Sequence, residues 1–499
     1  MSRINKVMLI FPPARISTFY DKLCCVPMGI SYLAAVIRDH YQVRILDSVT
    51  TGYEQERKLS WNYFQYGLPP DDIVREVEKF SPDLAGISCT SSSQFPIVAE
   101  ICEKIKKLSS EIITVTGGSH PSFLPEQSFK HAPGLDFIII GEGEESFPAL
   151  LTALDKGSGW ESIDGLAWRN NGEIRVNPKT KFIENLDRIP FPARDLLPLE
   201  KYFEINVPFM FYSKSPRNLS FLTSRGCPFK CTFCTSCHYW GNRIRYRSLE
   251  NVMEELRELK QRYRVEEIKF EEDNLLLNRE RAKKLFRAMI EEKLNFHWNI
   301  PGGAYLMSLL DEELVSLMKQ SGCFELTLPF ESGNQEVLDK IMKKPLDLAK
   351  AERAVRILKD YDIDTHAVFV IGLPGETKEQ IKNTFRFARK LKPDHSYCFI
   401  FNPLPGSALY QECIDKGYFD PEQVFYADFA TTGITTDEFN PTLLRRWQQH
   451  HSFFQNFSLL ARRPRKFFGK YLKRVARKNA LIAVLRAFRT FILSRLKNH

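Results

Sequence analysis

The chain has 499 residues, of which 43% are hydrophobic and 26% charged, with a net charge of +9. These proportions are typical of globular proteins, so they exclude a disordered chain and a polytopic membrane protein, and the length predicts about three domains. The N-terminus passes directly into a strand-like run without the apolar stretch of a signal peptide, so we expect a cytoplasmic protein. The odd number of cysteines, 11, favours metal ligation or free thiols over a disulfide framework.

Residues 1–155 are predicted to form a doubly wound α/β domain. Strand-like runs alternate with helical patterns along this segment. The runs are residues 7–11, 43–46, 84–88, 112–116 and 137–140. Nearly continuous apolar strands separated by helices predict a parallel sheet covered on both faces. Such sheets bind ligands beyond the carboxyl ends of their strands.

Residues 156–205 are predicted to be a connector, because polar turns and the proline-rich segment 189–195 replace the alternation. A second alternation fills residues 206–425. Its candidate strands are residues 219–224, 266–270, 297–300, 324–329, 364–371 and 396–401, with amphipathic helices such as 249–263 and 279–292 between them. Six such units fit a barrel of parallel strands, complete or partial, and we expect a partial (βα)6 barrel. Residues 426–499 remain as a helical region with a basic tail.

Three cysteines follow the first strand of the second alternation in a Cys-x3-Cys-x2-Cys spacing, namely Cys227, Cys231 and Cys234. Three thiolates on one loop can bind three irons of a [4Fe-4S] cubane and leave the fourth iron open for chemistry. The residues alone leave two alternatives open. One is a zinc knuckle with Cys237 or His238 as the fourth ligand, and the other is a set of thiols without metal.

This spacing after a strand, with an aromatic residue before the third cysteine, resembles the radical S-adenosylmethionine (SAM) superfamily. In that family the open iron chelates the amino and carboxylate groups of SAM. The resemblance implies further SAM contacts at later strand ends: Glu271, Glu272 and Asp273 for the methionine ammonium, Glu331 and Ser332 near the ribose and carboxylate, and Gly372 near the adenine. Each segment alone could be a helix cap or a turn.

The first domain resembles the cobalamin-binding domain that precedes the radical barrel in one subgroup of this superfamily. The resemblance implies cobalamin contacts at the strand ends by Ser88, Thr90, Gly117, Gly118, Gly141 and Glu142. Paired glycines allow a bulky nucleotide tail to lie against the backbone. A generic doubly wound domain with glycine turns is the alternative interpretation.

The first domain departs from many cobalamin proteins in one respect. The Asp-x-His-x-x-Gly segment that supplies a lower cobalt ligand is absent from the loop at residues 12–17. We therefore expect no protein histidine beneath the cobalt. His120 is interpreted as a loop residue or a contact of the nucleotide, and Cys24 and Cys25 as small buried hydrophobic residues.

Together the resemblances imply a radical enzyme that uses a [4Fe-4S] cluster, SAM and cobalamin. An electron from a flavodoxin- or ferredoxin-type donor would cleave SAM into methionine and a 5′-deoxyadenosyl radical, which abstracts hydrogen from an unactivated carbon. Methyl transfer to the resulting substrate radical is common in this subgroup, so we expect a methyltransferase. Oxidative cyclisation and other radical rearrangements stay open. A structural iron-sulfur or zinc protein that binds nucleic acid is the alternative of another class, and the acidic cluster 271–273 argues against it.

The C-terminal tail is strongly basic. From Phe439 onward there are fifteen Lys and Arg and no Asp or Glu, which leaves the rest of the chain at −6. An apolar stripe follows at Leu481, Leu485, Phe488, Ile492 and Leu496. Arginines interrupt it and it falls short of ~20 apolar residues, so a helix lying in an anionic membrane surface is more plausible than a spanning one. We expect peripheral contact with the inner face of the membrane and a hydrophobic or lipid-like substrate, unless the stripe packs on the barrel instead.

Overall fold

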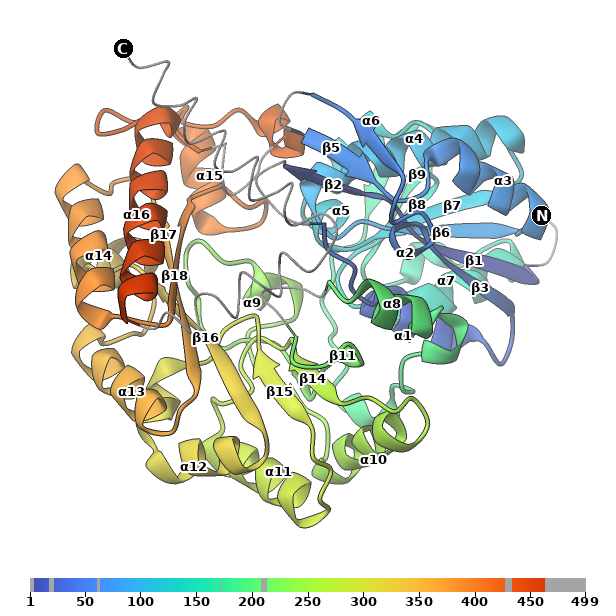
Figure 1. Cartoon of the computed structure of the whole chain (residues 1–499). Coiled ribbons are helices and arrows are strands. Elements are labelled where there is room, and N and C mark those ends of the chain that lie inside the picture. The colour runs from blue at the N-terminus through green and yellow to red at the C-terminus, as the bar shows by residue number, and fades with distance from the viewer. Residues whose placement is uncertain are drawn as a thin grey trace.

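The computed structural model describes residues 4–17, 22–60, 63–170, 172–207, 213–426 and 433–462. A seven-stranded sheet near the N-terminus and a six-stranded parallel sheet in the second half organise the chain (Figure 1). Residues 463–499, which include the predicted amphipathic stripe of the tail, lie outside the described residues. Among the residues that the structure describes, no helix is long and apolar enough to cross a membrane.

The first sheet has the order β10-β9-β8-β7-β6-β1-β3. Its five parallel strands are β1 (Lys6–Phe11), β3 (Gln42–Asp47), β6 (Leu84–Ser88), β7 (Ile113–Gly117) and β8 (Phe137–Ile139). Each overlaps one of the five predicted strands. The covering helices are α1 (Met28–Ile37) and α7 (Ser146–Lys156), which contact each other on one face, and α3 (Pro70–Phe80) and α4 (Phe95–Leu108), which do so on the other (Figure 1).

Two antiparallel additions were not predicted. The hairpin of β9 (Leu166–Asn170) and β10 (Glu173–Val176) extends the first sheet beyond β8, so part of the predicted connector at residues 156–205 belongs to that sheet. A separate sheet joins β2 (Ala14–Ser17), β5 (Tyr63–Tyr66) and β4 (Glu56–Lys58). These strands have three to five residues, which is too short for their alternation to stand out in a sequence.

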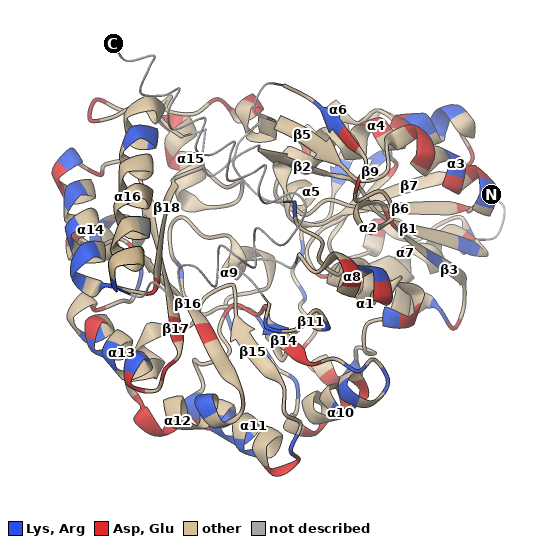
Figure 2. Ribbon diagram, in the orientation of Figure 1, with Lys and Arg blue, Asp and Glu red and all other residues tan. Residues whose placement is uncertain are grey.

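The second sheet contains six parallel strands in chain order: β11 (Asn218–Phe221), β14 (Glu267–Phe270), β15 (His297–Ile300), β16 (Cys323–Glu331), β17 (Asp364–Ile371) and β18 (His395–Ile400). The outer helices are α10 (Leu249–Gln261), α11 (Arg279–Glu291), α12 (Glu312–Gln320), α13 (Leu348–Asp360) and α14 (Lys378–Leu391). Charged residues concentrate on such outer helices, whereas the strands are largely uncharged (Figure 2). The predicted α/β fold class is confirmed.

Capping residues explain where the outer helices begin. Each follows a residue whose side chain accepts a backbone N–H of the first turn, which satisfies a donor that the helix leaves unpaired. The caps are Ser248, Asn278, Asp311, Asp347 and Thr377. After the last strand, α16 (Pro441–Arg462) packs on β18, where the Ser396 hydroxyl lies 2.9 Å from His451 Nε2.

Candidate active site

The three predicted cluster cysteines lie on one loop beyond the barrel's first strand. The loop follows β12 (Ser224–Arg225), which pairs with β13 (Arg245–Tyr246). The N–H of Thr232 donates to the Met342 carbonyl (3.0 Å), and the Thr232 carbonyl accepts from the N–H of Leu409 (2.9 Å). The loop is thereby fixed to segments that follow the fourth and sixth barrel strands. It carries three half-buried free thiols, those of Cys227, Cys231 and Cys234.

Hydrogen-bond donors reach two of the three sulfur atoms. The Asn274 side-chain amide donates to Cys227 Sγ (3.0 Å), and the Ser236 N–H donates to Cys234 Sγ (3.4 Å). Burial raises the pKa of the Cys227 thiol to about 11 and that of Cys234 to about 12, so metal binding must release their protons. Three thiols on one anchored loop, with N–H groups directed at two of the sulfurs, fit a [4Fe-4S] cluster held by three protein ligands.

Cys237 is the alternative ligand that the sequence leaves open. It is buried in α9 (Ser236–Tyr239), directly after the loop. Among the described residues, no group of three or more His, Cys, Asp and Glu side chains could hold a metal ion. A zinc knuckle needs four donors around one ion, whereas each thiolate of a cubane binds a different iron. The arrangement therefore suits the cubane better than the knuckle.

The acidic segment 271–273 does not act as one cluster, because its middle carboxylate is used inside the fold. Glu272 is buried and accepts from the N–H and hydroxyl of Thr223 (3.2 and 2.8 Å) and from the hydroxyl of Ser224. Burial raises the pKa of Glu272, and these hydrogen bonds oppose the rise. Glu272 thus holds the turn between β11 and β12. The SAM contact predicted for it is replaced by an internal one.

Glu271 and Asp273 flank this buried carboxylate and differ from it in exposure. Glu271 is half-buried and accepts from the Ser220 hydroxyl of β11 (2.7 Å). Asp273 is exposed and accepts from the hydroxyl of Ser236, just beyond the cluster loop. Neither residue is fully buried, and the Asp273 charge acts on the Cys227 and Cys234 thiols, so an ammonium group can reach the acidic segment there.

The residues predicted to contact SAM after the fourth and fifth strands are all buried. Glu331 has a left-handed φ of +62°, and its carboxylate lies 3.5 Å from Lys344 Nζ. The N–H of Gly372 donates to Glu376 (2.7 Å), and burial raises the pKa of that carboxyl to about 8. Ser332 is buried as well, and its hydroxyl lies 3.2 Å from that of Thr384. The sequence analysis assigned no role to Lys344 or Glu376, because neither belongs to a characteristic spacing.

Small residues line the carboxyl edge of the first sheet, where the cobalamin contacts were predicted. Ser88 and Thr90 lie at the end of β6, and Gly117 and Gly118 at the end of β7. At Gly118 φ is +115°, and an added Cβ would lie 2.1 Å from the Cys89 carbonyl oxygen, so only glycine fits. All four predicted contacts are half-buried or exposed. This open backbone edge fits a bulky nucleotide tail.

Glu142 differs from the other predicted cobalamin contacts. Gly141, just beyond β8, is half-buried with a φ of +69°, but the next residue, Glu142, is buried. Its carboxylate pairs with Arg225 (3.1 Å) and Arg245 (2.8 Å), both from the strands next to the cluster loop. Glu142 therefore contacts the barrel domain instead of an open ligand site, which corrects its predicted role.

His120 is packed in the core and is not a loop residue. Its ring lies 4.5 Å from that of Phe95 and 5.4 Å from that of Phe425. Burial lowers the pKa of His120 to about 3, so it stays neutral. Cys24 is buried, as predicted for a small hydrophobic residue, whereas Cys25 is only half-buried.

The loops at the barrel mouth face the first domain. The Tyr239 hydroxyl donates to the Gly141 carbonyl (3.4 Å), and the Tyr239 ring lies 6.2 Å from that of Phe123 in α5 (Ser119–Phe123). Phe123 also packs on Gly406, beyond β18, so closely that a Cβ there would lie 2.2 Å from its ring. The carboxyl ends of both sheets therefore meet. A radical reaction needs this arrangement, because its partners must be held in contact.

Comparison with known proteins agrees with this architecture. The Radical SAM superfamily matches residues 221–388, and the B12 binding domain matches residues 18–151. The cytidylyl-2-hydroxyethylphosphonate methyltransferase of Streptomyces wedmorensis is 33% identical over 87% of this chain and 86% of its own length. The hopanoid C-3 methylase of Methylococcus capsulatus is 26% identical over 67% of this chain and 62% of its own length.

A solved structure shares the fold over most of this chain. The radical SAM methyltransferase TsrM from Kitasatospora setae, solved with cobalamin and a [4Fe-4S] cluster, has a TM-score of 0.66 and 19% identity, over 83% of this chain and 78% of that one. Its likeness supports the fold, and the sequence relatives establish the family. The protein is therefore an enzyme that uses a [4Fe-4S] cluster, SAM and cobalamin, and it belongs to the cobalamin-dependent radical SAM methyltransferase family.

Proposed function

We propose that this enzyme transfers a methyl group to an unactivated carbon of a membrane-associated, lipid-like substrate. The proposal of a lipid-like substrate rests on an apolar surface of α16. Phe454 and Phe457 are 53% and 63% exposed, and they lie three residues apart, so they are neighbours on one face of the helix. The helix has three arginines and no acidic residue, and the chain continues into the basic tail. Exposed aromatic rings beside basic residues suit an anionic lipid surface.

The cofactor contacts that we propose follow from the geometry of the two carboxyl edges. Cys227, Cys231 and Cys234 hold the cluster, and Cys237 is not a ligand. Glu271, Asp273, Glu331 and the Gly372 backbone contact SAM, and Ser88, Thr90, Gly117, Gly118 and Gly141 contact cobalamin. The N–H groups of Asn274 and Ser236 that point at cluster sulfurs adjust the reduction potential. A flavodoxin- or ferredoxin-type protein supplies the electron.

The bound cofactors supply reductive cleavage of SAM and a transferable methyl group. The protein supplies orientation and a dry site. Tyr239, Phe123 and Gly406 pack the two domains together at the mouth, which keeps water away from the place where the domains meet. Glu271 and Asp273 offer carboxylates for the methionine ammonium, and Asp273 lies close enough to Cys227 and Cys234 to act on their thiols.

The test is anaerobic incubation of the cluster- and cobalamin-loaded enzyme with methyl-labelled SAM and a total membrane-lipid extract. We expect label in a lipid product and one 5′-deoxyadenosine for each methyl group transferred. Label that enters only water-soluble molecules of a parallel cytosolic extract would contradict the lipid substrate. Formation of 5′-deoxyadenosine without label in any product would indicate oxidative cyclisation or another radical reaction without methyl transfer.

A further inference from the structure

A buried ion-pair network joins the two cofactor-binding halves at one point. It consists of Glu142 and Glu144 from the first domain and Arg225 and Arg245 from the strands next to the cluster loop, and we call these four residues the interdomain clasp. Glu142 binds Arg225 (3.1 Å) and Arg245 (2.8 Å) with different carboxylate oxygens, and Glu144 binds the second terminal nitrogen of Arg225 (2.6 Å). None of the four side chains is more than 8% exposed.

The clasp is complete only when both domains contribute to it. Arg225 and Arg245 stand directly opposite each other in the β12–β13 ladder, where two like charges repel. The two carboxylates of the first domain neutralise them. The connector completes the network, because the Ile183 N–H donates to Glu142 (3.1 Å) and the Ile183 carbonyl accepts from Arg245 (2.7 Å). Such buried pairs need this degree of hydrogen bonding to offset their desolvation.

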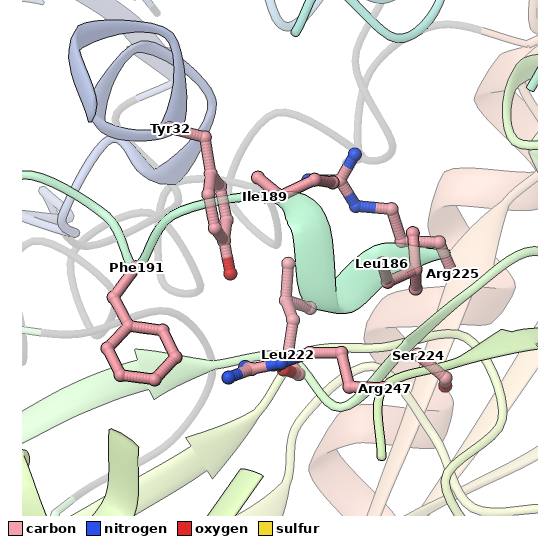
Figure 3. Close-up of a pocket in the computed structure, with 8 residues that line it drawn as sticks. All are labelled: Tyr32, Leu186, Ile189, Phe191, Leu222, Ser224, Arg225 and Arg247. Atoms are coloured by element: carbon pink, nitrogen blue, oxygen red, sulfur yellow. Dashed lines mark hydrogen bonds between the residues drawn. The ribbon is translucent and has the colours of Figure 1, made fainter. Parts of the chain in front are cut away.

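Aromatic rings and a small cavity surround Arg225, and Figure 3 shows it among the residues that line that cavity. Its guanidinium lies over the rings of Tyr32 in α1 (5.1 Å) and Trp240 (5.2 Å). Tyr32 and Arg225 line a cavity together with side chains of the connector and the barrel, among them Ile189 and Leu222. The cavity has a volume of about 10 Å³, which barely admits one water molecule.

The clasp lies within two residues of a proposed contact of each cofactor. On the barrel side only Gly226 separates Arg225 from Cys227. Its φ is +98° and an added Cβ would lie 2.1 Å from the Arg243 carbonyl oxygen, so the backbone there is closely confined. On the other side, Glu142 directly follows Gly141. A shift of either loop would therefore have to break the clasp.

We infer that the interdomain clasp is a positioning device that fixes the distance and orientation between cobalamin and the cluster. The inference rests on the proposed contacts of Gly141 and Cys227 and does not depend on the substrate. Ion pairs buried in this way are best attested as devices that set the register of two elements, more than as sources of stability.

The test replaces Glu142 with glutamine and compares it with a matched control, Glu255→Gln. Glu255 is equally buried and also binds two arginines, Arg194 (2.6 Å) and Arg247 (2.5 Å), but it lies between the connector and the barrel. Full-length proteins loaded with cluster and cobalamin are reduced to Co(II) and [4Fe-4S]+. Electron paramagnetic resonance then measures the dipolar coupling between the two spins, which falls with the cube of their distance.

We expect Glu142→Gln to lose or broaden the wild-type spin coupling while it retains both cofactors and still forms 5′-deoxyadenosine from added SAM. Glu255→Gln should keep the wild-type coupling. The inference fails if Glu142→Gln keeps that coupling, if both variants change it equally, or if Glu142→Gln simply loses a cofactor. Should Glu142→Gln fail to fold, Arg245→Lys, which keeps the charge but loses the fork geometry, must show the same altered coupling. Formation of 5′-deoxyadenosine by the wild type tests the proposed function separately.

Discussion

The two carboxyl edges that meet in this enzyme are built in opposite ways. The barrel edge relies on functional groups with individual partners, such as the Cys227 thiol beside the Asn274 amide. The edge of the first sheet relies on the absence of side chains, as at Gly117 and Gly118. Removal of a single sulfur atom from the barrel edge should therefore abolish the reaction. The first edge is sensitive instead to atoms that are added.

The largest effect is expected at the barrel edge. Changing Cys227, Cys231 or Cys234 to alanine should abolish the cluster and all 5′-deoxyadenosine formation, because each thiolate is one of only three proposed protein ligands. Iron and sulfide content and product chromatography measure this. Cys237→Ala is the control and should retain both. The ligand assignment is wrong if Cys237→Ala loses the cluster while Cys227→Ala keeps it.

The next effect is expected where an atom is added to the edge of the first sheet. Gly118→Ala should destabilise the protein and weaken cobalamin binding, because its Cβ would overlap the Cys89 carbonyl. Gly157→Ala is the matched control, since φ is also positive there (+72°) but nothing lies within 4 Å of the added atom. Gly118 (φ +115°, ψ −172°) lies in a backbone region open almost only to glycine, whereas Gly157 (φ +72°, ψ +13°) lies in the left-handed helical region, so the excess loss at Gly118 reports backbone strain together with the overlap. Denaturation and cobalamin titration should separate the two variants, and equal losses would contradict the steric argument.

A third, pH-dependent effect is expected behind the same edge. Burial lowers the pKa of His120 to about 3 in the folded state, against about 6.5 in the unfolded chain. The unfolded state therefore binds more protons between these values, and stability is full above pH 6.5 and falls as the pH drops towards 3. From pH 7 to pH 5 the loss is about 2 kcal/mol.

Replacing His120 by glutamine tests this dependence. The variant should be less stable at pH 7, because the ring packs against Phe95 and Phe425, but its free energy of unfolding should change less between pH 7 and pH 5. His40→Gln, at an exposed position, should leave the wild-type dependence unchanged. An unaltered pH slope in the His120 variant would show that other groups cause the acid sensitivity.

The features of each edge that depend on neighbouring residues in the chain could be predicted from the sequence. The cysteine spacing and all eleven parallel strands follow from patterns within a few residues, and the structure contains each strand within a few residues of its predicted bounds. The order of the two domains follows from the family resemblances, and the family matches at residues 18–151 and 221–388 agree with it.

Long-range partners could not be predicted. Glu142 sits in a glycine-rich loop that looks like a ligand site, but its partner Arg225 lies 83 residues away. Glu272 was grouped with two accessible carboxylates, although Thr223 and Ser224 bury it. Such errors arise because the sequence around a carboxylate does not indicate whether its side chain points into the fold or towards a ligand site.

The smallest effect on either edge is expected from the C-terminal region, which should change where the enzyme lies without changing its cofactor chemistry. Replacing Phe454 and Phe457 by serine, or ending the chain at Asn456, should lower binding to anionic vesicles in a flotation assay, because exposed aromatic area or basic charge is removed. Binding by the intact protein should also weaken in high salt, since part of it is electrostatic. Both variants should still form 5′-deoxyadenosine, because they change the end of α16, whereas Leu444 near its start is the residue that packs on Gly372. An intact protein that stays in the soluble fraction with anionic vesicles at low salt would remove the membrane contact and, with it, the argument for a lipid-like substrate.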